Sequence, residues 1–312
     1  MLVARQGGDA LQAGHFAQRE THVRQRSGIG HMFSSRPQYA ALGRFWRPAR
    51  VFWRIMTDTV LLAIDGPRAT ITLNDPAKHN RLDPAGLALL LAAVEKADAD
   101  PAVRVTVITG AGEKSFCSGY DLGSIPAGQR KPEAANDSGF ETVMDRIEAM
   151  RMPTLCALNG GVYGGATDLA LACDFRLGVK GMRFFMPAAR FGLHYYPGGL
   201  RRYTQKVSPS FAKRAFLLSE EFSDTDLVTV GYLDWLVDRA DFQAKVAEIA
   251  GRLAMLAPLS MANMKRAIEQ YAQAEPDVPA IRQNIRQCAT SDDLREGLAA
   301  LRERRAPAFK GR

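Results

Sequence analysis

The sequence predicts an α/β protein in which strands come in pairs followed by helices, with a mainly helical region at the end of the chain. Two β-branched runs, residues 60–64 and 69–73, are split by the Asp-Gly-Pro turn sequence at residues 65–67. A continuous apolar run at residues 103–109 has the composition of a buried strand. After about Ser208 the apolar pattern becomes helical. The chain is therefore expected to form an α/β core followed by a helical region.

Helix starts support this order of elements. Asp83 is a preferred N-cap residue, and Pro84 after it suits the first position of a helix that we expect to end near Ala97. Further elements are expected as a strand at 154–158, a helix at 165–172, a strand at 174–179 and a last helix at 292–305. The predicted division of the chain is an N-terminal extension at 1–56, an α/β core at 57–207 and a helical region at 208–312.

The composition is that of a soluble globular protein, with 46% hydrophobic and 24% charged residues. No apolar run reaches the roughly 18–20 residues that a membrane span needs. The four cysteines lie far apart, with no CxxC pair and no His at metal-ligand spacing. We therefore expect reduced thiols, no metal site and a cytoplasmic location.

The formal net charge of +8 is concentrated at the N-terminus. Residues 1–56 contain nine Arg against Asp9 and Glu20, so the rest of the chain is close to neutral. A basic surface for nucleic acid is thus not expected on the folded domain. Three explanations of the extension stay open: a start codon placed upstream of a natural start at Met56, an Arg-rich segment of the mitochondrial transit type, or a basic tail that binds polyanions.

Two loops contain the residues that the sequence suggests for catalysis. The first, residues 115–122 (SFCSGYDL), combines small residues with a Gly after a strand, so that a backbone N–H can turn into a cavity. The second, residues 159–169 (NGGVYGGATDL), has four glycines between a strand and a helix. Neither GxGxxG nor GxxxxGK[ST] is present in it, so it lacks the phosphate-binding patterns.

Together the loops suggest a site for an oxygen anion. A helix start presents unbonded N–H groups and a favourable dipole. Two backbone donors from different strands can hold one thioester oxygen as negative charge develops on it, and Asp168 would stand beside them to move a proton.

Four segments resemble motifs of the crotonase (enoyl-CoA hydratase/isomerase) superfamily. They lie in the family's order and cover about residues 57–312. The segments are the two loops just described, the turn 74–80 (NDPAKHN), and the stretch 288–297 (CATSDDLREG) with Phe309-Lys310 after it.

The resemblance implies a spiral of ββα units, a C-terminal helical trimerisation region, and a homotrimer or dimer of trimers. It implies an acyl-CoA thioester as substrate with no further cofactor. The amides of Tyr120 and Gly165 would form the oxyanion hole. The residues it implies for substrate or CoA binding are Lys78, His79, Asn80, Ser118, Asp121, Gly164, Phe309 and Lys310.

The sequence departs from the family where the two acids of a hydratase are expected. Asp168 stands at the first position as a shorter acid, and Ala188 stands at the second, where it can move no proton. The glycine–proline segment after it is two residues longer than usual and carries polar rings. His194 and Tyr195, or its neighbour Tyr196, are the candidate replacements, although all three can also be structural.

The resulting hypothesis is an enoyl-CoA hydratase/isomerase-type lyase or isomerase that uses Asp168, His194 and Tyr195. Its alternatives are other thioester chemistry, such as hydrolysis or carbon–carbon cleavage, and an acyl-CoA-binding protein with little turnover. Nucleic-acid binding through residues 1–56 is a further, less favoured function. Lys265 is expected on a solvated helix face.

Overall fold

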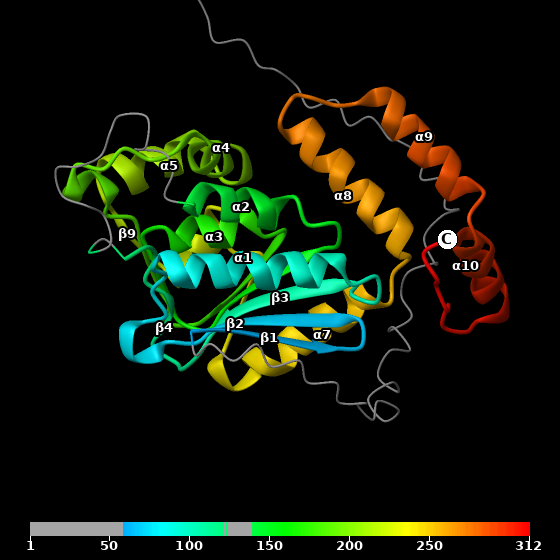
Figure 1. Ribbon diagram of the computed structural model, residues 1–312, viewed down its shortest axis with the longest axis horizontal. Helices are drawn as coiled ribbons and strands as arrows, with labels where there is room; N and C mark the ends of the chain where they lie inside the picture. Colours follow the sequence, from blue (N-terminus) through cyan, green and yellow to red (C-terminus); the bar gives the residue numbers. More distant parts are fainter. Residues whose placement is uncertain (1–58, 122, 124–138) are drawn as a thin grey trace, which may run out of the picture. The chain divides into compact units, whose positions relative to one another are not determined.

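The computed structural model describes residues 59–121, 123 and 139–312 (Figure 1). The chain divides into two units, residues 1–47 and 48–312, and all described residues belong to the second. The N-terminal extension, for which three explanations were open, therefore lies outside the described residues. No helix in the described part is long and apolar enough to cross a bilayer.

A larger sheet of six strands has the order β1-β2-β3-β5-β7-β10. β1 and β2 form the antiparallel hairpin that the turn at 65–67 predicts, and the other neighbours are parallel. The strands are β1 (Val60–Asp65), β2 (Arg68–Leu73), β3 (Val105–Gly110), β5 (Thr154–Leu158), β7 (Phe175–Val179) and β10 (Trp235–Val237). β3 and β5 are buried along most of their length, which explains why they read as continuous apolar runs.

A smaller sheet of four strands has the order β4-β6-β8-β9. β4, β6 and β8 run parallel, and β9 closes the sheet antiparallel to β8. The strands are β4 (Ser115–Cys117), β6 (Gly161–Tyr163), β8 (Arg183–Phe185) and β9 (Glu221–Ser223). Each repeat thus gives one strand to the larger sheet, the next to the smaller sheet, and then a helix, as in β3-β4-α2 and β5-β6-α3.

The helices begin where capping residues and prolines predict. Asp83 accepts a hydrogen bond from the Gly86 N–H at 2.7 Å, which confirms it as the N-cap of α1. The α-helices are α1 (Pro84–Ala99), α2 (Phe140–Glu148), α3 (Ala166–Ala172), α4 (Pro197–Lys206), α5 (Pro209–Leu217), α6 (Asp224–Thr229), α7 (Phe242–Ala254), α8 (Pro258–Ala272), α9 (Val278–Ala289) and α10 (Asp292–Glu303). Short 3₁₀ helices are η2 (Pro76–Lys78), η5 (Ala188–Phe191) and η6 (Arg239–Asp241). The region after residue 208, expected to be helical, also supplies β9 and β10 to the two sheets.

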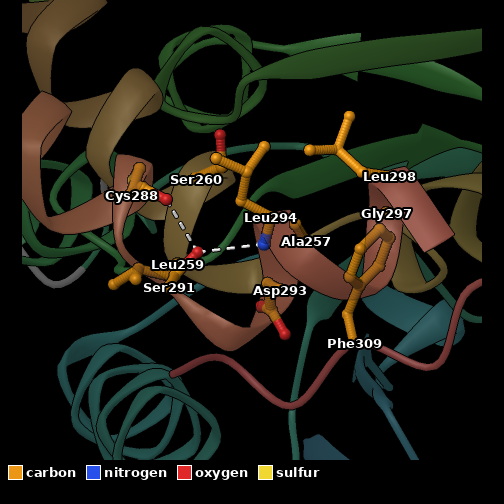
Figure 2. Close-up of a pocket in the computed structure, with 10 residues that line it drawn as sticks. All are labelled: Ala257, Leu259, Ser260, Cys288, Ser291, Asp293, Leu294, Gly297, Leu298 and Phe309. Carbon is orange, nitrogen blue, oxygen red and sulfur yellow. Dashed lines mark hydrogen bonds between the residues drawn. The ribbon is translucent and has the colours of Figure 1, made fainter.

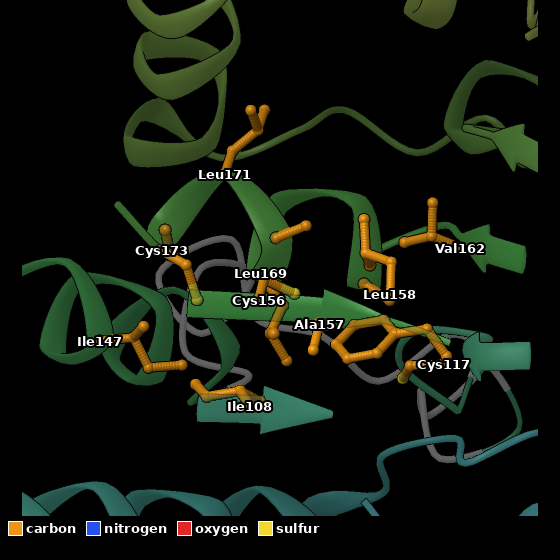
Figure 3. Close-up of a cluster of buried hydrophobic side chains, with 14 of the residues drawn as sticks. Ile108, Cys117, Ile147, Cys156, Ala157, Leu158, Val162, Leu169, Leu171 and Cys173 are labelled. Atoms are coloured by element: carbon orange, nitrogen blue, oxygen red, sulfur yellow. The ribbon is translucent and has the colours of Figure 1, made fainter. Parts of the chain in front are cut away.

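The core lies between the larger sheet and the helices that cover it. α1 packs on β1 and β2, and α7 packs on β3, so that the strands lie between the two helices in Figure 1. Figure 3 shows the centre of the core, where side chains of β3, β5, α2 and α3 meet. All seven residues of α3 are buried, so this helix has no solvent face on which a charge can be hydrated.

Asn80 fastens the turn after β2 to the strand β4. Its amide nitrogen donates to the backbone oxygens of Ala111, Ser115 and Phe116 at 2.9–3.0 Å, and its side-chain oxygen accepts from the Asp75 N–H at 3.0 Å. The residue is 1% exposed and has a φ of 55°, a left-handed conformation that Asn tolerates better than most residues.

Asn80→Ala is therefore expected to lower the free energy of unfolding by roughly 2–4 kcal/mol, because buried carbonyls lose their donor and Ala resists this φ. Urea unfolding measures the effect. Asn263→Ala is the matched control and should cost less than about 0.5 kcal/mol, since the hydrogen bond from the Asn263 amide to the Cys288 sulfur is long, at 3.7 Å. Wild-type stability combined with weaker CoA binding in Asn80→Ala would instead identify Asn80 as a ligand contact.

Candidate active site

Two loops meet at one edge of the smaller sheet. β4 and β6 are parallel neighbours, so the loops that follow them leave from the same edge. The contact is close at Gly119, whose φ is +87°: a Cβ there would lie 2.7 Å from the backbone nitrogen of Gly165 and 2.8 Å from the backbone oxygen of Tyr163. Only glycine fits this position, both for its φ and for the space it leaves.

The backbone directions suit two donors at this meeting point. The Leu82 N–H donates to the Gly119 oxygen at 2.9 Å, and the Asp121 N–H donates to the Leu82 oxygen at 2.8 Å. Because both bonds lie on one side of the segment, the N–H of Tyr120 faces away from Leu82. Gly165 is the N-cap of α3, so its N–H has no acceptor within the helix.

Asp168 is a fully buried acid whose two carboxylate oxygens are both engaged. Arg202 of α4 binds it in a bidentate manner, with Nε 2.9 Å from Oδ1 and Nη2 2.8 Å from Oδ2. The hydroxyl of Tyr196 also donates to Oδ2. The side chains of Asp168 and Arg202 are both 0% exposed, so their charges neutralise one another without help from water.

The cation of this pair is shared with two acids of α2. Arg202 Nη1 lies 2.7 Å from an oxygen of Asp145 and 3.2 Å from an oxygen of Glu148. Burial alone would lower the pKa of Arg202, but its hydrogen bonds and its attraction to Asp168 outweigh burial and raise it. Burial likewise opposes the charge of Glu148, yet the hydrogen bond from Arg201 and the charges of Lys206 and Arg202 hold the pKa of Glu148 below its usual range.

The segment after η5 carries the three polar rings at residues 194–196. The ring that contacts Asp168 is not the one that the sequence favoured. Tyr196, not Tyr195, contacts the carboxylate. Tyr195 stacks on Tyr196 with ring centroids 4.4 Å apart, and their hydroxyls are 3.3 Å apart. Burial first, and then the neighbouring negative charge of Asp168, raises the pKa of Tyr196 well above its ordinary value. The ring of His194 is exposed, and its Nδ1 lies 2.7 Å from the adjacent Tyr195 backbone oxygen.

The residues expected around CoA fall into two groups. The first group adjoins the loop after β4: the Nδ1 of His79 lies 3.0 Å from the Ser115 hydroxyl, and the Ser118 hydroxyl donates to the Lys78 backbone oxygen at 3.5 Å. The exposed Lys78 side chain approaches the Asp75 carboxylate to 3.8 Å.

Asp121 belongs to the same region and is paired with Arg81 at 3.2 Å. Gly164 precedes α3 with a φ of +53°, and its N–H donates to the Phe185 backbone oxygen at 2.9 Å.

The second group lies at α10. Figure 2 shows the ring of Phe309 beside Gly297 in an apolar pocket of about 220 Å³. The backbone N–H of Lys310 donates to Asp293 at 2.6 Å, and its side chain is exposed. The pocket residues are Ala257, Leu259, Ser260, Cys288, Ser291, Asp293, Leu294, Gly297, Leu298 and Phe309.

Two further titratable side chains, Cys117 and Lys265, are held by structural contacts. Cys117 is buried, and burial raises the pKa of its thiol to about 12. Lys265 was expected on a solvated face, but this is wrong: its ammonium binds Asp174 at 2.7 Å and its side chain is 9% exposed. No three His, Cys, Asp or Glu side chains gather as a metal site within residues 59–121 and 139–312.

Sequence reasoning missed Arg202 and Phe140. Arg202 stands next to Arg201 in a helix, where a pattern alone predicts two solvated charges. The signal that points to it is Asp168 itself, since an acid in an otherwise apolar helix requires a buried cation from elsewhere. Phe140 follows a segment with no clear pattern, and its contact with Gly165 depends on how α2 packs on α3.

The two sheets wound from strand–strand–helix units form the fold that the crotonase resemblance implied. A family model described as enoyl-CoA hydratase/isomerase matches residues 67–312. The chain therefore belongs to the enoyl-CoA hydratase/isomerase family, which confirms the superfamily predicted from its motifs.

Similar proteins match about four fifths of the chain. The chain is 29% identical over 263 residues to carnitinyl-CoA dehydratase of Salmonella typhi, covering 82% of this chain and 100% of that one. It is 27% identical over 254 residues to crotonyl-CoA hydratase of Syntrophomonas wolfei, covering 81% and 98%. A solved enoyl-CoA hydratase/carnithine racemase from Magnetospirillum magneticum superposes with a TM-score of 0.79 at 27% identity, covering 84% and 99%.

Removing the buried cation tests the site's electrostatics. Arg202→Met should lower the free energy of unfolding by about 3–5 kcal/mol, because it leaves Asp168 charged and buried without its partner. Arg214→Met is the matched control, since Arg214 forms an exposed pair with Glu220, and it should cost about 1 kcal/mol or less. In the double variant Arg202→Met with Asp168→Leu, part of the loss should return. Equal losses for Arg202→Met and Arg214→Met would contradict this account.

Proposed function

We propose that this enzyme adds water to, or removes it from, the acyl group of a CoA thioester. In this proposal the thioester oxygen binds the N–H groups of Tyr120 and Gly165. As an enolate forms, both hydrogen bonds strengthen, and each such donor is typically worth about 3–4 kcal/mol of transition-state stabilisation. The close contact between the loops at Gly119 supports two donors that meet at one point.

The observation that carries the proposal is the hydroxyl of Tyr196 on Asp168. Asp168 remains the carboxylate of the reaction, but it acts through Tyr196, because Arg202 already donates hydrogen bonds to both of its oxygens. The Tyr196 oxygen takes a proton from the water as the water oxygen bonds to the β-carbon, while the Tyr196 hydroxyl proton moves to Asp168. The α-carbon of the resulting enolate then takes a proton from the Tyr196 hydroxyl as Asp168 returns its proton to Tyr196, which restores both groups. Tyr195 holds Tyr196 in place by stacking. The exposed ring of His194 leaves it a weaker candidate for this work.

A second candidate is an acyl-CoA-binding protein with little turnover. Two observations favour it. Ala188 is buried at the start of η5 and offers no second acid, and Asp168 is already neutralised by Arg202. The Tyr196 experiment below separates the two candidates, because only the enzyme loses turnover when the Tyr196 hydroxyl is removed.

CoA is proposed to bind along the turn at η2. Lys78, His79 and Ser118 present polar groups beside the first loop, whereas the Asn80 side chain is used to hold that loop in shape. Phe309 and Lys310 follow α10, beside Gly297 and Asp293 of that helix, and are proposed to reach the CoA of a neighbouring subunit. The cytoplasmic location stays a prediction.

Tyr196→Phe should lower kcat for hydration of crotonyl-CoA by roughly 10²–10⁴, the usual effect of losing a general acid–base group. Tyr195→Phe is the matched control and should change kcat less than about tenfold, since it keeps the packed ring and removes a hydroxyl whose contact with the Tyr196 hydroxyl is long, at 3.3 Å. The raised pKa of Tyr196 keeps its phenol protonated, so kcat should not fall through its titration below about pH 10. Full activity in Tyr196→Phe would refute its role.

A homotrimer or a dimer of trimers is proposed as the assembly, supported by exposed apolar side chains on the last three helices. Ile268 on α8 is 66% exposed, and Ile285 on α9 is 62% exposed. Light scattering should give three or six times the chain mass of 34.2 kDa. Ile268→Glu should shift the protein toward smaller species, because a buried charge at an interface is costly. Leu217→Glu, 73% exposed on α5, is the control that should leave the mass unchanged. A monomeric wild-type protein would rule this assembly out.

A further inference from the structure

Phe140 is a buried ring at the centre of the proposed site that no motif identifies. It is the first residue of α2 and is 3% exposed. Its far edge points at Gly165: a Cβ on that glycine would lie 2.7 Å from the Phe140 Cζ and 3.1–3.2 Å from its two Cε atoms. The ring therefore lies against the Cα of the residue whose N–H is proposed to bind the thioester oxygen.

The same ring contacts the other two residues of the site. The Tyr120 ring meets it edge to face, with centroids 6.2 Å apart and planes at 82°. The Tyr196 ring lies on another side, with centroids 6.0 Å apart and planes at 55°. Phe140 is thus in contact with both oxyanion-loop residues and with the tyrosine proposed to move the proton.

The side chains packed around Tyr196 leave little space into which the Phe140 ring could move on that side. Tyr195 stacks on Tyr196, and its ring also contacts Phe216 with centroids 4.8 Å apart. A Cβ on Gly199 would collide with the Tyr195 ring. Side chains in such packing shift only at a cost, since interiors are as dense as organic crystals.

The position of Phe140 has a consequence for the acyl group. A carbonyl oxygen bound to the amides of Tyr120 and Gly165 places the next carbons of the acyl chain beside Phe140. Those carbons must also come within reach of the Tyr196 hydroxyl. A bulky substituent next to the thioester, or a long chain that turns toward Tyr196, would meet the Phe140 ring.

We propose that Phe140 is a specificity-determining residue that restricts the enzyme to short, unbranched enoyl-CoAs of about crotonyl size. This inference rests on the proposed function, because it places the acyl group by the Tyr120 and Gly165 amides. It adds the substrate class to that function and names the side chain that selects it.

The test compares Phe140→Ala and Phe140→Leu with wild type on crotonyl-, 2-decenoyl- and cinnamoyl-CoA. In wild type, kcat/KM should favour crotonyl-CoA. In Phe140→Ala, the ratio of decenoyl- or cinnamoyl-CoA to crotonyl-CoA should rise by roughly 10- to 200-fold, the range that small changes in apolar pocket shape produce. Phe140→Leu retains more of the core volume, so it should fold if Phe140→Ala does not, with a smaller shift in the same direction. An unchanged ratio in both variants would overturn the proposal.

A matched control separates pocket shape from general loss of an aromatic ring. Phe191 is 59% exposed at the end of η5, and Phe191→Ala should leave the substrate ratio within about twofold of wild type. If Phe191→Ala shifts this substrate ratio as much as Phe140→Ala does, the effect is not specific to Phe140 and the proposed role is wrong.

Failure of the proposed reaction can be told from failure of this inference by measuring binding. Isothermal titration with butyryl-CoA and decanoyl-CoA needs no turnover. If wild type does not hydrate any of the enoyl-CoAs but Phe140→Ala gains at least about tenfold affinity for decanoyl- over butyryl-CoA, the specificity role stands while the reaction fails. If turnover is normal and Phe140 changes neither binding nor substrate ratio, the reaction stands while the specificity role fails.

Discussion

The buried ion pair of Asp168 and Arg202 is the constraint around which the site is arranged. Asp168 lies in α3, a helix with no solvent face, where an unpaired carboxylate would be very costly. Arg202 supplies the missing charge from α4 and is itself held by two acids of α2. One cation therefore ties three helices together behind the loops, and the Tyr196 hydroxyl is the part of this network that is proposed to act on a substrate.

The repeating topology explains how distant segments come to one place. Each repeat sends one strand to the larger sheet and the next to the smaller sheet, so β4 and β6 become parallel neighbours although about 45 residues separate them in sequence. Their following loops then meet at one edge. Gly119 allows the first loop to lie close against the backbone of the second loop, and the Asn80 side chain holds the first loop by a hydrogen bond. Sheet order, not local sequence, thus aligns the two proposed amide donors.

Predictions from sequence succeeded where the determining interaction is local. The hairpin, the Asp83 N-cap and the strand at 154–158 each follow from neighbouring residues, and each is present with its expected bounds or within a residue of them. Asn80 and Lys265 were harder to interpret. A polar residue in a turn and a lysine on a helix are normally solvated, but here tertiary packing buries one and pairs the other with Asp174.

The family, the two loops and the acid at 168 could be inferred from the sequence, because their motifs are contiguous and each depends on backbone freedom or on one residue type. Which groups face that acid depends on the fold. Arg202 and Tyr196 are 34 and 28 residues away from Asp168 along the chain, and they meet it through the packing of α4 on α3. Phe140 meets the neighbouring Gly165 through the packing of α2 on α3. Such contacts carry no periodicity, so the acid at 168 could be recognised while its partners could not.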